Sequence, residues 1–471
     1  MPRANLQRNL VLGLCLLWAA ITATAQDQAV PTEYLATPGV IPATAQRSGD
    51  AAAGYQALVN QGYVSCGVPW RAFTAMGAAT ADYALPQAAD RPDNLPYAFN
   101  RFTNADGVDI VASNCLTCHA APFNGELVLG LGNEQLDFSD DPVINAELAG
   151  AFIDDEIAAK PWQRWADRIA AIAPFLQTDT RGVNPAPNLT LALIAHRDPQ
   201  TLAWSEQPAL PLPPTQPLPV SVPPWWRMAK KHAMFYNGMG RGDQTRFMMM
   251  KALVCTDDLA EAEAIYDYFD DIRAFIVSLR APRYPFSIDR TLAAQGQAVF
   301  EQTCAACHGT YGESWQYPNL LVGLEQIGTD PAYARQIVAI GGPYIDWFQQ
   351  SFYGQGAQVK PALGYVAPPL DGVWATAPYL HNGSVPTLAT LLDSPQRPRY
   401  WTRNFEQPVF DQQALGWRFS VLEKGKDGVT GNARTRVYDT TLPGYSNTGH
   451  TFGDVLEDAQ RQALLEYLKT L

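Results

Sequence analysis

Two short motifs with the same spacing of cysteine and histidine stand out in the chain, Cys115-Leu-Thr-Cys118-His119 and Cys304-Ala-Ala-Cys307-His308. C-x-x-C-H is the attachment sequence of c-type haem. On one helical turn the two thiols each form a thioether with a haem vinyl group, and the histidine binds the iron as proximal ligand. A chance match or a disulfide-forming C-x-x-C pair is the alternative, but a chain with 7 Cys and 6 His rarely repeats the motif by accident. We therefore expect two covalently bound haem c groups, with iron held by His119 and His308.

The first residues have the pattern of an export signal. Arg3 and Arg8 precede an apolar run over residues 10–21, and small residues follow at 23–25. The run is too short for a stable membrane span, and the small residues form a cleavage site. We expect a signal peptide over residues 1–25, cut near Ala25, and a mature protein in the periplasm or outside the cell. Cys15 lies in this run and leaves with it.

Two further cysteines, Cys66 and Cys255, belong neither to a motif nor to the signal. In an oxidising compartment two such thiols most simply form a disulfide, although the sequence leaves open whether they meet. A bond between them would tie the N-terminal arm to the end of the first haem domain.

Composition excludes several classes of protein. With 47% hydrophobic, 11% aromatic and 17% charged residues, the 471-residue chain can build two or three domains and is not a disordered acidic protein. A net charge of −13 argues against nucleic acid as a partner, because nucleic acid binds basic faces. No later run reaches the roughly 18 apolar residues that a spanning helix needs, so no membrane span is expected. The acidity keeps the protein soluble or attracts a basic redox protein.

Helical periodicity surrounds the second motif. Residues 291–301 predict a helix that leads into Cys304 and carries Gly296 on its inner face. Leucines recur at helical spacing over residues 464–471, with Asp458 as the expected N-cap. Because glycine lets a second helix cross closely, we expect these two helices to pack against each other.

The other elements divide the chain into parts. An apolar helical stripe over residues 259–279 is followed by the linker 281–285. Eight prolines between residues 207 and 224 exclude regular helix there and predict an extended run over the surface. We expect a mainly α fold with long loops, made of two cytochrome c-like haem domains and an arm: an N-terminal arm over 26–98, an N-terminal haem domain over 99–285 and a C-terminal haem domain over 286–471.

The C-terminal haem needs a second axial ligand. Simple electron carriers use methionine, but none of the 8 Met follows residue 250. Beyond its motif, this half of the chain offers only His381 and His450 as histidines. We favour His450, because it lies in a glycine-flanked loop that can turn a side chain inward. His381, in a turn-rich stretch, is the alternative. Either histidine could instead have only a structural role, held by hydrogen bonds.

The second face of the N-terminal haem has several candidate neighbours. Its axial ligand can come from a histidine or methionine of the same half: His196, His232, Met228, Met234, Met239 or the run 248–250. In the other arrangement Phe235 or Phe247 lies over the iron in an open pocket. An open face means chemistry on O2 or H2O2, because access and polarity select the reactivity of a haem.

Two more pairs of residues near this haem can take part. Trp225 or Trp226 can stand between the haems and pass electrons, although packing is the commoner role of tryptophan. Glu126 and Glu134 follow the first motif and are candidates for an acid/base group. The simpler interpretation is that each is a solvated carboxylate in a loop.

A longer stretch adds a third signature, over residues 368–388: Pro-Pro-Leu-Asp-Gly-Val-Trp-Ala-Thr-Ala-Pro-Tyr-Leu-His-Asn-Gly-Ser-Val-Pro-Thr-Leu. With the two haem motifs it resembles the bacterial dihaem cytochrome c peroxidase superfamily. Segment 225–241, the Asn-Gly form of the turn at 382–383 and Gly449-His450 before the terminal helix are most similar to its rubber-oxygenase-like branch, the dihaem c-type oxygenases. The resemblance covers most of residues 60–471.

The resemblance implies a reactive N-terminal haem held by His119, with an open or O2-occupied opposite face. It also implies a six-coordinate C-terminal haem held by His308 and His450. The chain is shorter than the rubber-cleaving enzymes, and His232 stands beside Met234-Phe235 at the position compared with their distal segment. Polyisoprene cleavage therefore does not carry over, whereas oxidation with O2 or H2O2 does.

Two functions remain open from the sequence. In the first, the protein is a haem-dependent oxidoreductase, a peroxidase or a dioxygenase, with His119, Phe235 and Trp226 at the reactive haem. Its partners are then O2 or H2O2, a small apolar organic substrate and a small redox protein that exchanges electrons. In the second, both haems are six-coordinate and the protein only carries electrons.

Overall fold

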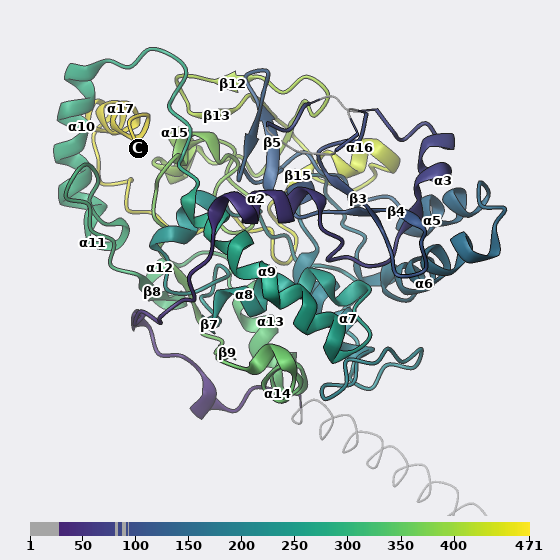
Figure 1. The fold of residues 1–471 in the computed structure, drawn as a ribbon. Coiled ribbons are helices and arrows are strands. Elements are labelled where there is room, and N and C mark those ends of the chain that lie inside the picture. Colours follow the sequence, from purple (N-terminus) through teal and green to yellow (C-terminus); the bar gives the residue numbers. More distant parts are fainter. Residues whose placement is uncertain (1–27, 81–82, 87–90, 93) are drawn as a thin grey trace, which may run out of the picture.

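The computed structural model describes residues 28–80, 83–86, 91–92 and 94–471. The expected signal peptide lies outside the described residues. Within the described part, no helix is long and apolar enough to cross a membrane. Helices of different length alternate with small sheets, and the paired helices α10 and α17 lie at the opposite end of the molecule from α5 and α6 (Figure 1).

The first hydrophobic core is built around helix α9 (Leu259–Ser278), which the apolar stripe predicts. Its residues Ile265, Phe269 and Ile272 are buried, and α2 (Ala51–Asn60) packs across it. A Cβ on Gly54 of α2 would meet the carbonyl oxygen of Asp271 at 1.8 Å, so only glycine permits this crossing. Helix α2 was not expected, because the N-terminal arm shows no clear helical periodicity.

A disulfide bond joins Cys66 to Cys255, as predicted. Both cysteines are fully buried in the first core. The bond therefore ties the segment before the first haem motif to the segment just before α9.

The second hydrophobic core contains the predicted pair of helices, α10 (Arg290–Thr303) and α17 (Asp458–Leu468). A Cβ on Gly296 would meet the carbonyl oxygen of Ala463 at 1.9 Å, which confirms the expected close crossing. Asp458 is not the cap of α17 but its first residue. Glu457 is the N-cap and forms a capping box with Gln460.

The remaining helices range from short turns to the long helix α6. They are α3 (Trp70–Ala75), α4 (Leu116–His119), α5 (Pro142–Gly150), α6 (Glu156–Ile172), α7 (Ala186–Ala195), α8 (Gln244–Met248), α11 (Ala305–His308), α12 (Leu324–Ile327), α13 (Ala332–Ile340), α14 (Gly342–Gln350), α15 (Leu388–Leu391) and α16 (Gly431–Thr435), with 3-10 turns η3 (Trp225–Lys230) and η4 (Met249–Val254).

Small sheets make the fold mixed rather than mainly α, which corrects the expected fold class. The strands pair as β1 (Gly39–Val40) with β8 (Leu320–Gly323) and β10 (Gly364–Val366); β2 (Val68–Pro69) with β4 (Asp109–Ser113) and β3 (Phe99–Thr103); β5 (Ala120–Phe123) with β6 (Glu126–Leu129); β7 (Gly240–Gly242) with β9 (Ala357–Val359); β12 (Phe410–Asp411) with β13 (Gly416–Trp417); and β14 (Phe419–Val421) with β11 (Tyr400–Arg403) and β15 (Tyr438–Asp439). These strands have two to five residues, too few for the alternation of apolar and polar residues that identifies a strand in sequence. Two of the sheets, β1–β8 and β7–β9, join parts of the chain that are far apart in sequence.

The proline-rich stretch contains no helix, as expected, but it does not stay on the surface. Val220, Ser221 and Val222 are buried, and so are the first residues of η3 that follow. We call residues 220–227 the inter-core segment, because its Trp225 lies in the first core and its Trp226 in the second.

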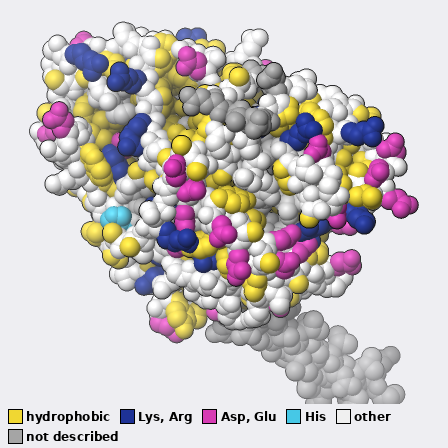
Figure 2. Space-filling model, viewed as in Figure 1, with side chains coloured by type: hydrophobic (Ala, Val, Ile, Leu, Met, Phe, Trp, Pro, Cys, Tyr) yellow, Lys and Arg dark blue, Asp and Glu magenta, His cyan; other side chains and the backbone are white. Residues whose placement is uncertain are grey.

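Side chains of opposite charge are interspersed over the face shown in Figure 2. Acidic side chains lie mainly over its lower and right-hand part, and several basic ones lie at its upper left.

Candidate haem-binding sites

The second C-x-x-C-H motif ends at His308, on the short helix α11. The Nδ1 of His308 lies 2.8 Å from the carbonyl oxygen of Pro368 and donates a hydrogen bond to it. This hydrogen bond fixes the tautomer and leaves the lone pair of Nε2 free for a metal. Burial lowers the pKa of His308, so the ring is neutral at pH 7 and able to act as a ligand.

His450 lies opposite His308. The centroids of the two rings are 6.1 Å apart, with an angle of 55° between the ring planes. An imidazole nitrogen binds a metal ion at about 2 Å. Two imidazoles on opposite sides of one ion therefore have their centroids about 6 Å apart. Burial and the neighbouring His308 lower the pKa of His450 to about 4, so this ring is neutral too.

The loop that carries His450 has an unusual backbone. His450 has φ +47° and Gly449 has φ +75°, both in the left-handed region. A Cβ on Gly449 would meet the carbonyl carbon of Gly328 at 2.1 Å, so glycine is required at 449. The N–H of His450 donates to the carbonyl of Ile327 at 2.8 Å, which fixes the loop against the end of α12.

Arg397 holds the same loop from the other side. Its Nη1 donates to the carbonyls of Asn447 and Gly449, each at 2.6 Å. Its Nη2 donates to the carbonyls of Leu391 and His450, each at 3.0 Å. One guanidinium group thus binds the loop to the end of α15 and compensates for its left-handed backbone. Sequence reasoning missed Arg397, because no motif marks it.

His381, the alternative ligand, lies elsewhere. Its ring stacks on that of Tyr365 with centroids 4.1 Å apart, among Tyr236 and Tyr333. Burial lowers its pKa to about 3. The structure thus brings His450, and not His381, to His308.

The first C-x-x-C-H motif lies on α4 and ends at His119. The ring of Trp225 stacks on His119, with centroids 4.7 Å apart and an interplanar angle of 20°. Gly130 connects the two backbones, because its N–H donates to the carbonyl of His119 and its carbonyl accepts from the N–H of Trp225. Burial lowers the pKa of His119 to about 3, and the nearby carbonyl of Pro223 opposes this shift.

The polar groups present fit two haem groups. Cys115, Cys118, Cys304 and Cys307 form no disulfide and are free for thioethers. The buried Nδ1 atoms of His119 and His450 have no hydrogen-bond partner among the described residues. No cluster of three or more His, Cys, Asp or Glu in that part of the chain is placed to hold a bare metal ion. Single histidines and a histidine pair suit an iron whose other ligands come from a porphyrin.

Adjacent tryptophans of the inter-core segment enter different cores. Trp225 belongs to the first core, beside His119, whereas Trp226 belongs to the second. The indole N–H of Trp226 donates to the carbonyl of Asp371 at 2.8 Å. Gly372 lies against that ring, since a Cβ there would approach it to 3.0 Å. The two tryptophans thus connect the surroundings of the two haem motifs.

Residues 364–402 match the family model of RoxA-like, cytochrome c-like proteins. The matched segment runs from β10 to β11 and contains His381 and Arg397, but neither C-x-x-C-H motif. It supports the rubber-oxygenase-like part of the resemblance and a haem cytochrome with an oxidoreductase role.

Two curated relatives are similar to part of the chain. Uncharacterized protein y4iJ of Sinorhizobium fredii is 32% identical over 260 residues, which cover 41% of this chain and 41% of that protein. Uncharacterized protein y4iM of the same organism is 31% identical over 238 residues, which cover 42% of this chain and 52% of that protein. The matches thus span about half or less of the relatives' own length.

The predicted distal residue Phe235 has φ +67° and meets Phe247 edge to face, with centroids 5.7 Å apart. Both pack in the apolar cluster that contains Trp225. Met249 and Met250 are buried in this cluster as well.

The remaining histidines of the N-terminal half have other partners. The Nδ1 of His232 lies 2.8 Å from the carbonyl of Ile41. The Nδ1 of His196 lies 2.8 Å from the carbonyl of Ser205, and its ring stacks on Trp204. None of the ring contacts between described residues pairs His119 with a second histidine.

Glu134 is not a solvated loop carboxylate, in contrast to the plainer expectation. It is buried, and burial raises its pKa to about 8. Its Oε1 accepts from the N–H of Val222 at 3.0 Å, and Arg403 donates to its backbone carbonyl. Glu126, on β6, is exposed. Sequence could not reveal the burial of Glu134, because its partner Arg403 lies 269 residues away.

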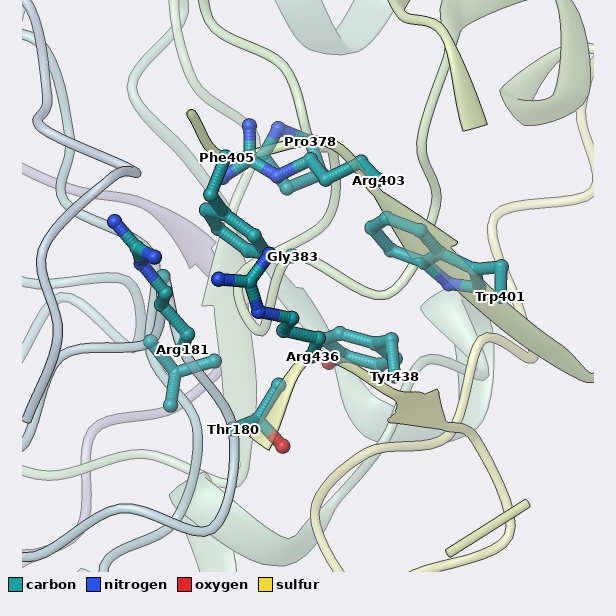
Figure 3. Close-up of a pocket in the computed structure, with 11 residues that line it drawn as sticks. Thr180, Arg181, Pro378, Gly383, Trp401, Arg403, Phe405, Arg436 and Tyr438 are labelled. Carbon is teal, nitrogen blue, oxygen red and sulfur yellow. The ribbon is translucent and has the colours of Figure 1, made fainter. Parts of the chain in front are cut away.

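A pocket beside Glu134 lies between residues 180–183, the turn at 378–383 and strands β11 and β15 (Figure 3). Three arginines line it, but each has a partner: Arg181 and Arg436 bind Glu406, and Arg403 binds the carbonyl of Glu134. The pocket therefore lies between distant parts of the chain, and its arginines already have partners within the protein.

Proposed function

We propose that the chain is an exported dihaem c-type oxidoreductase that uses O2 or H2O2 at its N-terminal haem. In this proposal Cys115, Cys118 and His119 hold the reactive haem. The second haem is held by Cys304, Cys307, His308 and His450, and it relays electrons.

The difference between the two motif histidines carries the proposal. His308 has a second imidazole at the distance expected for a shared iron, whereas the ring beside His119 belongs to Trp225. A pair of imidazoles closes both faces of an iron and leaves it suited to electron transfer. A single histidine leaves one face available to a small molecule.

A haem iron, when bound, supplies the redox chemistry with O2 or H2O2. The protein has three tasks beside it. Trp225 orients His119 by stacking, Phe235 and Phe247 belong to an apolar cluster that keeps water away, and Trp226 connects the two sites.

The position of Glu134 favours an apolar organic substrate over simple peroxide reduction. A peroxidase needs an acid/base group beside the bound peroxide. The carboxyl of Glu134 accepts a hydrogen bond from the N–H of Val222. Its charged neighbour is Arg403, which donates to the backbone carbonyl of Glu134. In this proposal the Glu134 carboxyl is therefore occupied by the backbone of the inter-core segment and does not serve as the acid/base group. Reduction of H2O2 to water with electrons from a small redox protein is the second reaction to assay.

An electron carrier with two six-coordinate haems is the alternative. The thioethers of Met249 and Met250 are buried in the same cluster as Trp225, and those of Met228, Met234 and Met248 pack against it, so that each is a candidate second ligand of the N-terminal haem.

The test uses the mature protein, produced with its haem-attachment machinery. Mass spectrometry should give two haem c groups per chain, and cyanide should change the spectrum of one of them. O2 uptake with an apolar alkene and oxidation of a reduced small cytochrome by H2O2 then distinguish oxygenase from peroxidase. A single haem, or two haems indifferent to cyanide, would contradict the proposal.

A further inference from the structure

Arg227, at the end of the inter-core segment, is a buried cation with few partners. Its Nε donates to the backbone carbonyl of Asp371 at 3.1 Å, and its Nη2 lies 3.4 Å from the hydroxyl of Thr376. Both are neutral acceptors. A buried guanidinium without a bound carboxylate is costly, and natural proteins rarely leave one so.

The nearest carboxylate already has a partner. Both oxygens of Asp371 accept from the ammonium group of Lys230, at 2.8 and 2.9 Å. Lys231 follows Lys230 in the sequence, and its side chain has no hydrogen bond or ion pair in the described part of the chain. Burial, and to a smaller extent the charge of Arg227, lowers the pKa of Lys231 to about 8. Three cations and one carboxylate therefore leave an excess of two positive charges.

This charge excess lies at the second haem motif. Pro368, whose carbonyl accepts the hydrogen bond of His308, precedes Asp371 by three residues, and the carbonyl of Asp371 accepts the hydrogen bond of Arg227. The hydroxyl of Tyr311 donates to the carbonyl of His308, and Lys230 lies 4.9 Å above the Tyr311 ring.

The two motif histidines have different cations as electrostatic neighbours. The charge of Arg227 contributes to the lowered pKa of His308, whereas the cation that acts on His119 is Lys251. The excess charge therefore belongs to the C-terminal site.

We propose that Arg227 and Lys231 form an anion site that binds the two propionate carboxylates of the C-terminal haem. A haem carries two such carboxylates, which matches the excess of two positive charges. Arg227 presents a planar fork suited to a carboxylate, and Lys231 adds a point charge. This assignment rests on the proposed function, because it needs a haem at Cys304 and Cys307.

The site has a consequence for electron transfer. Cations beside a haem favour the reduced iron, which carries less positive charge, and so raise its reduction potential. Arg227 directly follows Trp226. The cation that raises the reduction potential of the C-terminal haem therefore belongs to the inter-core segment, which connects the two haem sites.

The test compares holoprotein variants R227Q, K231Q and the double variant with R399Q as matched control. Arg399 is exposed and is not part of either site. The readouts are the reduction potential of each haem, from spectroelectrochemical titration, and the propionate-bending vibrations in resonance Raman spectra.

We expect R227Q and K231Q each to lower the reduction potential of the C-terminal haem by at least about 59 mV. For a one-electron couple this is a tenfold change in the ratio of reduced to oxidised haem at a given potential. The propionate vibrations of that haem should change, and R399Q should match the wild type. R227K should keep the potential closer to wild type than R227Q does, since it retains the charge.

An unchanged potential and unchanged vibrations in both single variants would overturn the site, and so would changes confined to the N-terminal haem. If R227Q does not accumulate, K231Q alone still decides the question, because the Lys231 side chain has no hydrogen bond or ion pair to lose in the described structure. Absence of a haem at Cys304 and Cys307 in the wild type would instead refute the proposed function.

Discussion

The ring of His450 faces the ring of His308 with 6.1 Å between their centroids, and both imidazoles are neutral at pH 7. His381 stacks on Tyr365 instead. Replacing His450 by Ala should therefore turn the C-terminal haem from low spin to high spin, because it loses an axial ligand. H381A should leave the spin state unchanged. Optical and EPR spectra of the oxidised variants check this, and the opposite pattern would exchange the roles of the two histidines.

The hydrogen bonds of Arg397 should decide how firmly His450 stays in place. R397Q loses bonds from a charged donor to the loop carbonyls, worth about 1.5–3 kcal/mol each. We expect imidazole added to R397Q to bind the C-terminal haem, whereas it does not bind in the wild type or in R399Q. R397K keeps the charge but not the fork, so it should restore the wild-type behaviour only in part. Wild-type resistance to imidazole in R397Q would show that Ile327 and Gly328 suffice to hold the loop.

Glu134 should make stability depend on pH. Its pKa rises from the ordinary 4.5 to about 8 in the folded protein because the carboxyl is buried. The unfolded chain ionises first, so this carboxyl destabilises the fold increasingly as the pH rises from 4.5 towards 8. The free energy of unfolding should fall by about 1.4 kcal/mol for each pH unit within that window.

The E134Q variant keeps an oxygen for the N–H of Val222 but has no charge to bury. The difference between its melting temperature and that of the wild type should therefore increase in favour of the variant as the pH rises from 5 to 8. E126Q, at an exposed position of the neighbouring hairpin, is the control and should show a constant difference. A constant difference for E134Q as well would mean that Glu134 is ionised in the folded protein.

The disulfide between Cys66 and Cys255 closes a loop with a sequence separation of 189 residues. Removing it should lower the stability by about 2–5 kcal/mol, because the unfolded chain gains freedom. A C66A/C255A variant should melt at a lower temperature while its haem spectra stay as in the wild type. Dithiothreitol should destabilise the wild type and leave this variant unaffected; equal sensitivity of the two would contradict the prediction.

Local patterns in the sequence predicted the parts of the fold that depend on neighbouring residues. Periodicity or a fixed spacing makes three of these parts recognisable: the haem motifs, the apolar stripe of α9 and the glycine of α10. Arg397, the burial of Glu134 and the short strands could not be found in this way, because the partners involved are distant in sequence. Arg403 and Glu134 are 269 positions apart, and β1 pairs with β8 from the other half of the chain. The burial of Val220 to Val222 was missed for the same reason.

The central claim is that one haem is closed by two histidines and the other has an open face. EPR spectra of the fully oxidised protein, recorded with and without cyanide, test it most directly. The arrangement of His308, His450 and His119 predicts one low-spin bis-histidine signal that cyanide does not change and one haem that binds cyanide. Two low-spin signals in every oxidation state, both unaffected by cyanide and peroxide, would contradict it and make the protein an electron carrier.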